Sequence, residues 1–143
     1  QTKHGVAKPV YRVFEALHGA GNRRLSVEGS HPTAEVLALK EGKQVMLFAY
    51  NHDIERRDIA PQEMELTLVG QIASIVIDEE HCNPKKAWET MGSPAYLTRE
   101  QVEVLDKESR LTYEQIPVAG NGETKLHFTA AEESVTIFRI SLA

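Results

Sequence analysis

The chain has 143 residues, a formal net charge of -5, 41% hydrophobic residues and 26% charged residues. This composition is typical of one soluble globular domain. It excludes a disordered chain, a membrane-embedded chain and a complete (β/α)8 barrel, which needs about 250 residues. Because acidic residues outnumber basic ones and neither type forms long blocks, we expect no nucleic acid and no membrane surface as a partner.

The cysteine content restricts the redox chemistry. Cys82 is the only cysteine, which excludes an intramolecular disulfide and a CxxC zinc or redox motif. The first residues contain neither an initiator methionine nor the apolar core of a signal peptide, and we expect the chain to be cut from a longer one. The sequence leaves the cytoplasm, the periplasm and secretion all open as localisations.

The first predicted element is a helix that begins at Pro9, a residue suited to the first helical turn, and ends at Gly19. Its apolar residues follow the i, i+3, i+4, i+7 spacing of one helix face: Val10, Val13, Phe14 and Leu17. Such a short, strongly apolar helix must dock on something larger than itself, inside this chain or outside it.

After residue 22 the apolar period changes to two, which predicts short β-strands. We expect strands at residues 24–28, 34–40, 44–50, 63–69, 74–77, 124–129 and 134–142. The continuous apolar run of residues 45–50 predicts a central strand covered on both faces. A change of phase within residues 134–142 predicts a bulge or burial on both faces. The fold class that this pattern favours is mainly β, an antiparallel β-sandwich with short helical insertions.

Two short helices are predicted between the strands. Asn83 can cap the first, Pro84 fits its first turn, and Gly92 ends it. Thr98 can cap the second, and Gln101 three residues later completes a capping box.

The densest polar cluster is the run Asp78-Glu79-Glu80-His81-Cys82-Asn83. Neighbouring carboxylates on one loop do not give the separation across a sugar that a pair of glycosidase carboxylates requires. His81 and Cys82 are adjacent, without the spacing that lets two ligands converge on one metal ion. A solvated connection between a strand and a helix is therefore the favoured interpretation.

Other candidates also have simpler structural interpretations. The run Asn51-His52-Asp53 contains a His-Asp pair, but no serine or cysteine stands in a recognisable nucleophile context, so a loop at a strand end is favoured. Trp88 could stack on a sugar ring, although its helical spacing with Ala87 and Met91 is more typical of core packing. The residues alone assign no catalytic, cofactor-binding or metal-ligating position.

Two stretches nevertheless resemble a known family. Residues 4–18, with Lys8 and Pro9 as the opening, are similar to the last barrel helix of glycoside hydrolase family 39, which contains β-xylosidases and α-L-iduronidases. A second stretch resembles the insertion in the sandwich domain of that family, with Cys82 where a serine is expected. Its matching residues are Asp78, Glu79, His81, Asn83, Trp88, Gly92, Ser93 and Pro94.

The resemblance implies a (β/α)8 catalytic barrel beside a β-sandwich, and hydrolysis of glycosides with retention through two glutamates. In the family, the acid/base glutamate follows an asparagine at the end of the fourth barrel strand, and the nucleophile ends the seventh. This sequence contains no Asn-Glu pair. We therefore expect both catalytic residues outside this chain, no cofactor, and no catalysis by this chain alone.

Residues 1–22 are accordingly expected to be the end of the barrel, and residues 23–143 an accessory β-sandwich. The parent enzyme would hydrolyse xylosides, with another β-glycosidase specificity as the alternative. The expected contacts are with the barrel, through Val10, Phe14 and Leu17, and with further copies in a homo-oligomer, through residues 78–94. Two other classes stay open: a freestanding sandwich that binds polysaccharide through exposed aromatic residues, and an assembly domain without affinity for sugar.

Overall fold

The computed structural model describes residues 2, 5–55, 57–69, 71–77, 81–117 and 123–142. The strands are β1 (Arg23–Leu25), β2 (Ala34–Glu41), β3 (Gln44–Asn51), β4 (Gln62–Val69), β5 (Gln71–Ile77), β6 (Glu114–Ile116), β7 (Glu123–Ala130) and β8 (Ser134–Ser141). The helices are α1 (Pro9–His18), α2 (Pro84–Thr90) and α3 (Arg99–Glu108). The predicted mainly β, antiparallel fold with helical insertions is confirmed.

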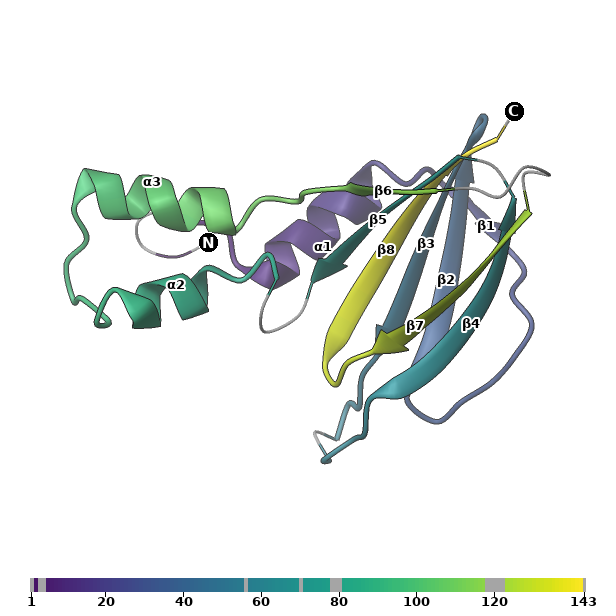
Figure 1. Ribbon diagram of the computed structural model, residues 1–143, viewed down its shortest axis with the longest axis horizontal. Coiled ribbons are helices and arrows are strands. Elements are labelled where there is room, and N and C mark those ends of the chain that lie inside the picture. Colours follow the sequence, from purple (N-terminus) through teal and green to yellow (C-terminus); the bar gives the residue numbers. More distant parts are fainter. Residues whose placement is uncertain are drawn as a thin grey trace.

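The strands form two antiparallel sheets of different size (Figure 1). The larger sheet has the order β1-β2-β3-β8-β5-β6, and the smaller one consists of β4 and β7 alone. The first strand is shorter than predicted, because the chain leaves the sheet after Leu25 and turns through Gly29, whose φ is +122°. Strand β6, which pairs with β5 at the edge of the larger sheet, was not predicted.

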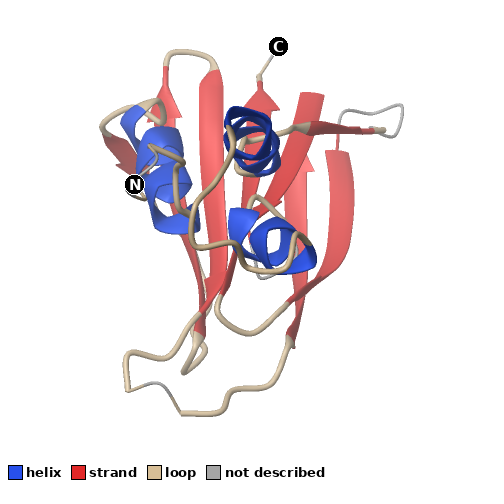
Figure 2. Ribbon diagram, turned by 90° about the vertical axis from the view of Figure 1, so that its left-hand side faces the viewer, coloured by secondary structure: helices blue, strands red, loops and turns tan. Residues whose placement is uncertain are grey.

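The larger sheet is covered on both faces. The β4–β7 pair packs on one face, where Leu66, Leu126 and Phe128 pack against a core that includes Leu47 and Phe138. Helix α1 covers the other face, and Figure 2 shows all three helices together in front of the strands. Residues 45–49 of β3 are all buried, which confirms the prediction of a central strand covered on both faces.

Strand β8 is also buried on both faces. Ile137 contacts the α1 side, while Phe138 and Ile140 contact the β4–β7 side. Its pairing with β3 is unbroken from Ser134 to Ser141. The structure therefore explains the unusual apolar pattern by two-sided burial and not by a bulge.

Helices α2 and α3 form a hairpin that projects from the sheet between β5 and β6 (Figure 1). The predicted caps are present: the Asn83 side chain accepts a hydrogen bond from the Lys85 backbone N–H at 3.1 Å, and Thr98 and Gln101 form the capping box. In the described part of the chain, no helix has both the length and the apolar character needed to cross a membrane.

Candidate functional site

Helix α1 has apolar side chains on two faces, and only one of these faces is covered. Ala16 and Ala20 are buried against Met46, Phe48 and Ile137 of the larger sheet. Val13 and Leu17 pack around the same cluster. Leu17, which was expected to contact a partner together with Val10 and Phe14, packs in part against the sheet of its own chain.

The other face of α1 presents three large apolar side chains to solvent. Val10 is 59% exposed, Tyr11 43% and Phe14 65%. Val10 and Phe14 are four residues apart, so they lie one above the other on the same helix face. An uncovered apolar group beside the packed side of the same helix is typical of an element between two layers.

The chain approaches itself closely where α1 leads into β1. Gly21 has a φ of +84°, and a Cβ atom there would come within 2.6 Å of the Glu41 Cβ and 2.8 Å of the Lys40 carbonyl oxygen. Glycine is therefore required both for the backbone conformation and for the space. This contact sets the end of α1 against the end of β2.

Arg12 ties α1 to the helical hairpin. Its side chain is only 12% exposed. Its Nε donates to the carbonyl oxygen of Ser109 at 2.8 Å, and Nη2 donates to the Ser109 hydroxyl at 3.0 Å. Ser109 is fully buried and forms the C-cap of α3, so the cation also lies at the negative end of that helix. The position of α1 is therefore fixed from two directions, by the sheet and by α3.

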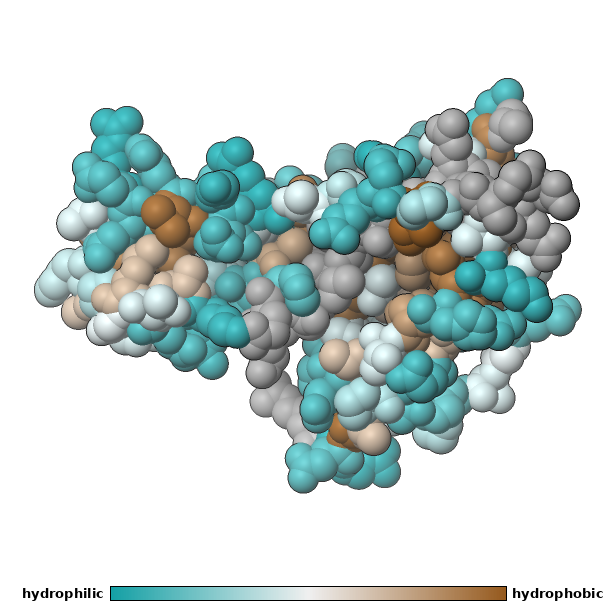
Figure 3. All heavy atoms as spheres, in the orientation of Figure 1, coloured by the Kyte–Doolittle hydropathy of each residue, from teal (hydrophilic) through white to brown (hydrophobic). Residues whose placement is uncertain are grey.

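The two stretches that carry the family resemblance meet at one cavity. This cavity, of about 620 Å³, lies between the segment that leads into α1 and the α2–α3 hairpin, and its lining includes Lys8, Pro9, Asn83, Trp88 and Pro94. Figure 3 shows hydrophobic side chains gathered on the hairpin, with hydrophilic ones around them. Five of the ten residues singled out from the sequence thus come together in space, and no Asp or Glu is among the described lining residues.

The remaining motif residues shape the hairpin. The Trp88 indole N–H donates to the Pro94 carbonyl oxygen at 3.1 Å, and Trp88 is half-buried. Gly92 and Ser93 both have positive φ angles, of 84° and 52°, which turn the chain after α2. His81 is exposed, whereas Asp78, Glu79 and Glu80 lie outside the described residues.

The side chains of His52 and Asp53 pair with two different residues and not with each other. Asp53 is 6% exposed and accepts hydrogen bonds from the backbone N–H and the guanidinium of Arg57, at 2.8 to 3.1 Å. These bonds lower the pKa of Asp53 to about 2. His52 instead pairs through Nδ1 with Glu133, which is 81 residues away in the sequence and could not be found from spacing.

The serine beside Glu133 is engaged by its own chain. The hydroxyl of Ser134, the residue after Glu133, donates to the Ala131 carbonyl oxygen at 2.7 Å, and Ser134 is only 2% exposed. Asn51 is fully buried and donates to the carbonyl oxygens of Ala60 and Ala130. These contacts hold the loop of residues 52–61 against the end of the sandwich, in agreement with the loop predicted there.

Neither a metal site nor a reactive thiol is identified among the described residues. Within them, no group of three or more His, Cys, Asp or Glu side chains is arranged to hold a metal ion. Cys82 has a φ of 54°, and its thiol donates to the Arg110 carbonyl oxygen at 3.3 Å, so it joins the two ends of the helical hairpin.

Comparison with known proteins gives consistent matches. The family model for glycosyl hydrolases family 39 matches residues 1–124. A β-xylosidase of Caldicellulosiruptor saccharolyticus is 32% identical over 146 residues, which cover 96% of this chain and 30% of that protein. A β-xylosidase of Geobacillus stearothermophilus is 19% identical, over 96% of this chain and 27% of that protein. The chain thus spans less than a third of the length of these relatives.

Solved structures match the fold at low sequence identity. The crystal structure of the GH39 enzyme from Xanthomonas axonopodis pv. citri has a TM-score of 0.72 at 14% identity, over 97% of this chain and 31% of that one. A GH39 β-xylosidase from Caulobacter crescentus has a TM-score of 0.71 at 19% identity, over 96% of this chain and 28% of that one.

Proposed function

The chain belongs to glycoside hydrolase family 39, as a C-terminal region of such an enzyme, and from this premise we propose that it is an accessory β-sandwich that supports a catalytic barrel. Residues 1–22 would contribute the last helix of the barrel, and residues 23–143 the sandwich. The parent enzyme would hydrolyse xylosides with retention, since the relatives named above are β-xylosidases.

The observation that carries this proposal is the two-sided apolar character of α1. One side of the helix packs on the larger sheet, and the other presents Val10, Tyr11 and Phe14 to solvent. A helix at the junction of a barrel and a sandwich needs both sides to be apolar, because each layer buries one of them. A freestanding sandwich would have no reason to keep Phe14 65% exposed.

Arg12 and the cavity at the base of the hairpin support the same role. By holding α1 against both the sheet and α3, Arg12 presents the exposed face in one fixed orientation. A surface that is ordered before binding loses less conformational entropy when the partner docks. Lys8, Pro9, Asn83, Trp88 and Pro94 would then act as structural residues at this junction and not as catalytic ones.

Catalysis would belong to the barrel. Retaining glycosidases use two carboxyl groups about 5 to 5.5 Å apart on either side of the scissile bond. Asp53 and Glu133, the carboxylates nearest to His52, are engaged by Arg57 and His52. We therefore expect no hydrolysis by the 143-residue chain alone.

Hydrolysis of a chromogenic β-xyloside tests the proposal. The purified chain, shown to be folded by circular dichroism, should give no turnover, while the parent enzyme should hydrolyse the substrate. Turnover by the chain alone would contradict the proposal.

Docking through α1 is tested separately in the parent enzyme. The double variant Val10→Ser and Phe14→Ser should lower the stability of the parent, because it removes apolar contacts with the barrel. Ile54→Ser is the matched control, since Ile54 is 88% exposed on the loop of residues 52–61. Equal effects of the control and the double variant would contradict docking through this face.

A further inference from the structure

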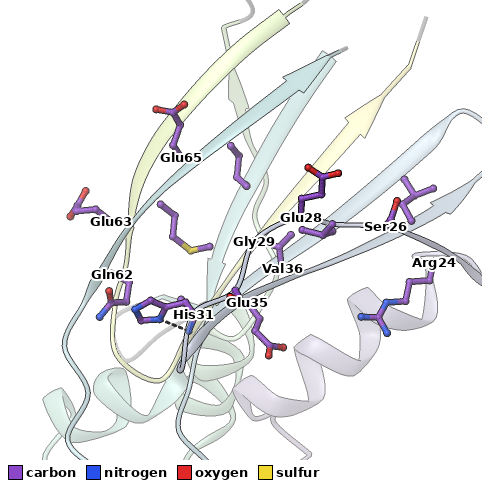
Figure 4. A pocket seen from close by; sticks show the side chains of 16 residues that line it. Arg24, Ser26, Glu28, Gly29, His31, Glu35, Val36, Gln62, Glu63 and Glu65 are labelled. Carbon is purple, nitrogen blue, oxygen red and sulfur yellow. Dashed lines mark hydrogen bonds between the residues drawn. The ribbon is translucent and has the colours of Figure 1, made fainter.

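His31, in the loop between β1 and β2, accepts hydrogen bonds from the backbone (Figure 4). Its Nδ1 accepts from the Ala34 backbone N–H at 3.1 Å and from the Thr33 backbone N–H at 3.3 Å. A backbone N–H can only donate, so Nδ1 carries no proton and the ring is protonated at Nε2. The contact therefore requires the uncharged form of the imidazole. We call residues 31–34 the His31 turn.

The His31 turn replaces a strand partner at the start of β2. The Thr33 carbonyl oxygen accepts from the His52 backbone N–H at 2.9 Å, on the side of β3. Backbone groups of successive residues in an antiparallel strand point to opposite sides, so the N–H of Ala34 points away from β3. On that side, within the described residues, β1 pairs with residues 38–40 of β2 and does not reach Ala34. Ala34 is 8% exposed, so loss of the His31 acceptor would leave a largely buried N–H unpaired.

The loop of residues 26–33 depends on such contacts for its position. Residues 26–32 are all exposed, so the loop buries little surface of its own. Segments with few buried contacts open locally at a low cost in free energy. The loop forms one wall of a cleft of about 780 Å³, and residues 62–66 of β4 form the opposite wall. A change at the His31 turn would therefore change the width of this cleft.

The charged groups of the cleft have partners other than His31. Besides His31, the charged side chains that line it are Arg24, Glu28, Glu35, Glu63 and Glu65. Glu35 accepts a hydrogen bond from the Tyr50 hydroxyl on the α1 side of the larger sheet, and Arg24 lies on the same side. On β4, Glu63 accepts from the Thr129 hydroxyl, and Glu65 pairs with Lys125 and His127. Glu28 belongs to the loop itself.

The titratable groups at the end of β3 are also paired elsewhere. His52 pairs with Glu133, and Asp53 pairs with Arg57. Among the described residues, none of the salt bridges includes His31. Protonation of His31 would therefore remove the acceptor of the His31 turn without an ion pair in place to hold the charged ring there.

We propose that His31 makes the loop of residues 26–33 sensitive to acid. The neutral imidazole holds the loop against the start of β2, and protonation of Nδ1 removes the acceptor, releases the loop and widens the cleft beside β4. Histidine is the side chain that ordinarily changes its charge between about pH 5 and pH 8. The ordered loop is therefore present at the upper end of this range and is lost as the pH falls.

Hydrogen exchange of the parent enzyme, followed by mass spectrometry, tests the proposal. Rates are measured at about pH 8 and about pH 5 and divided by the chemical exchange rate at the same pH. The variant is His31→Asn, because an asparagine side-chain oxygen can accept the same backbone hydrogen bonds and does not titrate. At pH 8, residues 26–34 should exchange equally in wild type and variant. At pH 5, they should exchange about tenfold faster in the wild type, because only the wild type loses these hydrogen bonds.

Two further variants complete this experiment. His31→Ala has no acceptor at either pH and should exchange rapidly at both. His52→Asn is the matched control, because its ring pairs with Glu133 and not with the His31 turn, and it should keep the wild-type response. Equal exchange of wild type and His31→Asn at pH 5, or loss of the pH response in His52→Asn, would overturn the proposal.

Nitrogen-15 NMR of the parent enzyme with labelled histidine gives a second measurement. The signals of His31 are those missing from the spectrum of His31→Asn. At about pH 8, Nδ1 should have the chemical shift of an unprotonated ring nitrogen and Nε2 that of a protonated one. The opposite tautomer would overturn the proposal, because a protonated Nδ1 cannot accept from Thr33 and Ala34.

Discussion

The two faces of α1 should respond differently to substitution. Phe14→Ser removes an apolar side chain from the exposed face, and Leu17→Ala removes one from the face that packs on the sheet. In the 143-residue chain, we expect Phe14→Ser to leave the free energy of unfolding nearly unchanged. Leu17→Ala should lower it by about 2 kcal/mol, the low end for a truncated core leucine, because Leu17 is only partly buried.

In the parent enzyme, by contrast, Phe14→Ser should have a clear effect. A phenylalanine side chain buries about 200 Å² when fully covered, and Phe14 is 65% exposed in this chain, which leaves about 130 Å² for a partner to cover. At about 25 cal/mol per Å², covering this area contributes about 3 kcal/mol. Phe14→Ser should therefore weaken the contact between barrel and sandwich by up to about that amount.

Urea unfolding measures both effects. Trp88 is the only tryptophan of the chain and gives a fluorescence signal for the isolated chain, and circular dichroism gives a second signal. Scanning calorimetry of the parent follows the contact between its domains. If Phe14→Ser destabilises the isolated chain as much as Leu17→Ala does, or leaves the parent unchanged, the assignment of the two faces is wrong.

Three further substitutions test the contacts that hold the molecule together. Arg12→Ala should lower the free energy of unfolding by about 2 kcal/mol and speed hydrogen exchange in α3, because the buried oxygens of Ser109 lose a charged donor. Arg99→Ala, at an 89% exposed side chain, should change both quantities little. Asp53→Asn should lower stability at neutral pH. The pKa of Asp53 is held at about 2, below its ordinary 3.8, so the ion pair stabilises the fold above about pH 4 and is lost as the pH falls through 2. The difference between wild type and variant in unfolding experiments should therefore shrink below pH 4, and a constant difference would contradict this. Thr98→Ala should lower the free energy of unfolding by about 1 kcal/mol, because it removes the capping box of α3. Thermal unfolding measures this, and an unchanged melting temperature would contradict the role of the cap.

Much of the local structure could be predicted from the sequence. Pro9 and Gly19 mark the limits of α1, and Asn83 and Thr98 form caps, because these signals depend on residues within one helical turn. The alternation of residues 64–68 placed Leu66 and Leu68 in the core for a similarly local reason. The motif residues around Asn83 and Trp88 also identified the family, which the comparisons confirm.

The errors and omissions concern contacts between distant residues. The stripe from Val10 to Leu17 was treated as one face, but the sheet covers Val13 and Leu17 and leaves Val10 and Phe14 exposed. Helical spacing gives the width of an apolar stripe and does not say how much of it one partner can cover. Strand β6 has only three residues and no clear alternation, so it is defined by its pairing with β5.

The sequence by itself determined most of the elements, their order and the family, because periodicity, caps and motifs are properties of near neighbours. Only the tertiary structure decided that His52 pairs with Glu133, that Arg12 reaches Ser109 across 97 residues, and that the loop after β1 lies across a cleft from β4. These contacts depend on how the two sheets and the helices pack together. A one-dimensional pattern specifies which side chains need to be buried, and the packing of the whole chain determines which partners bury them.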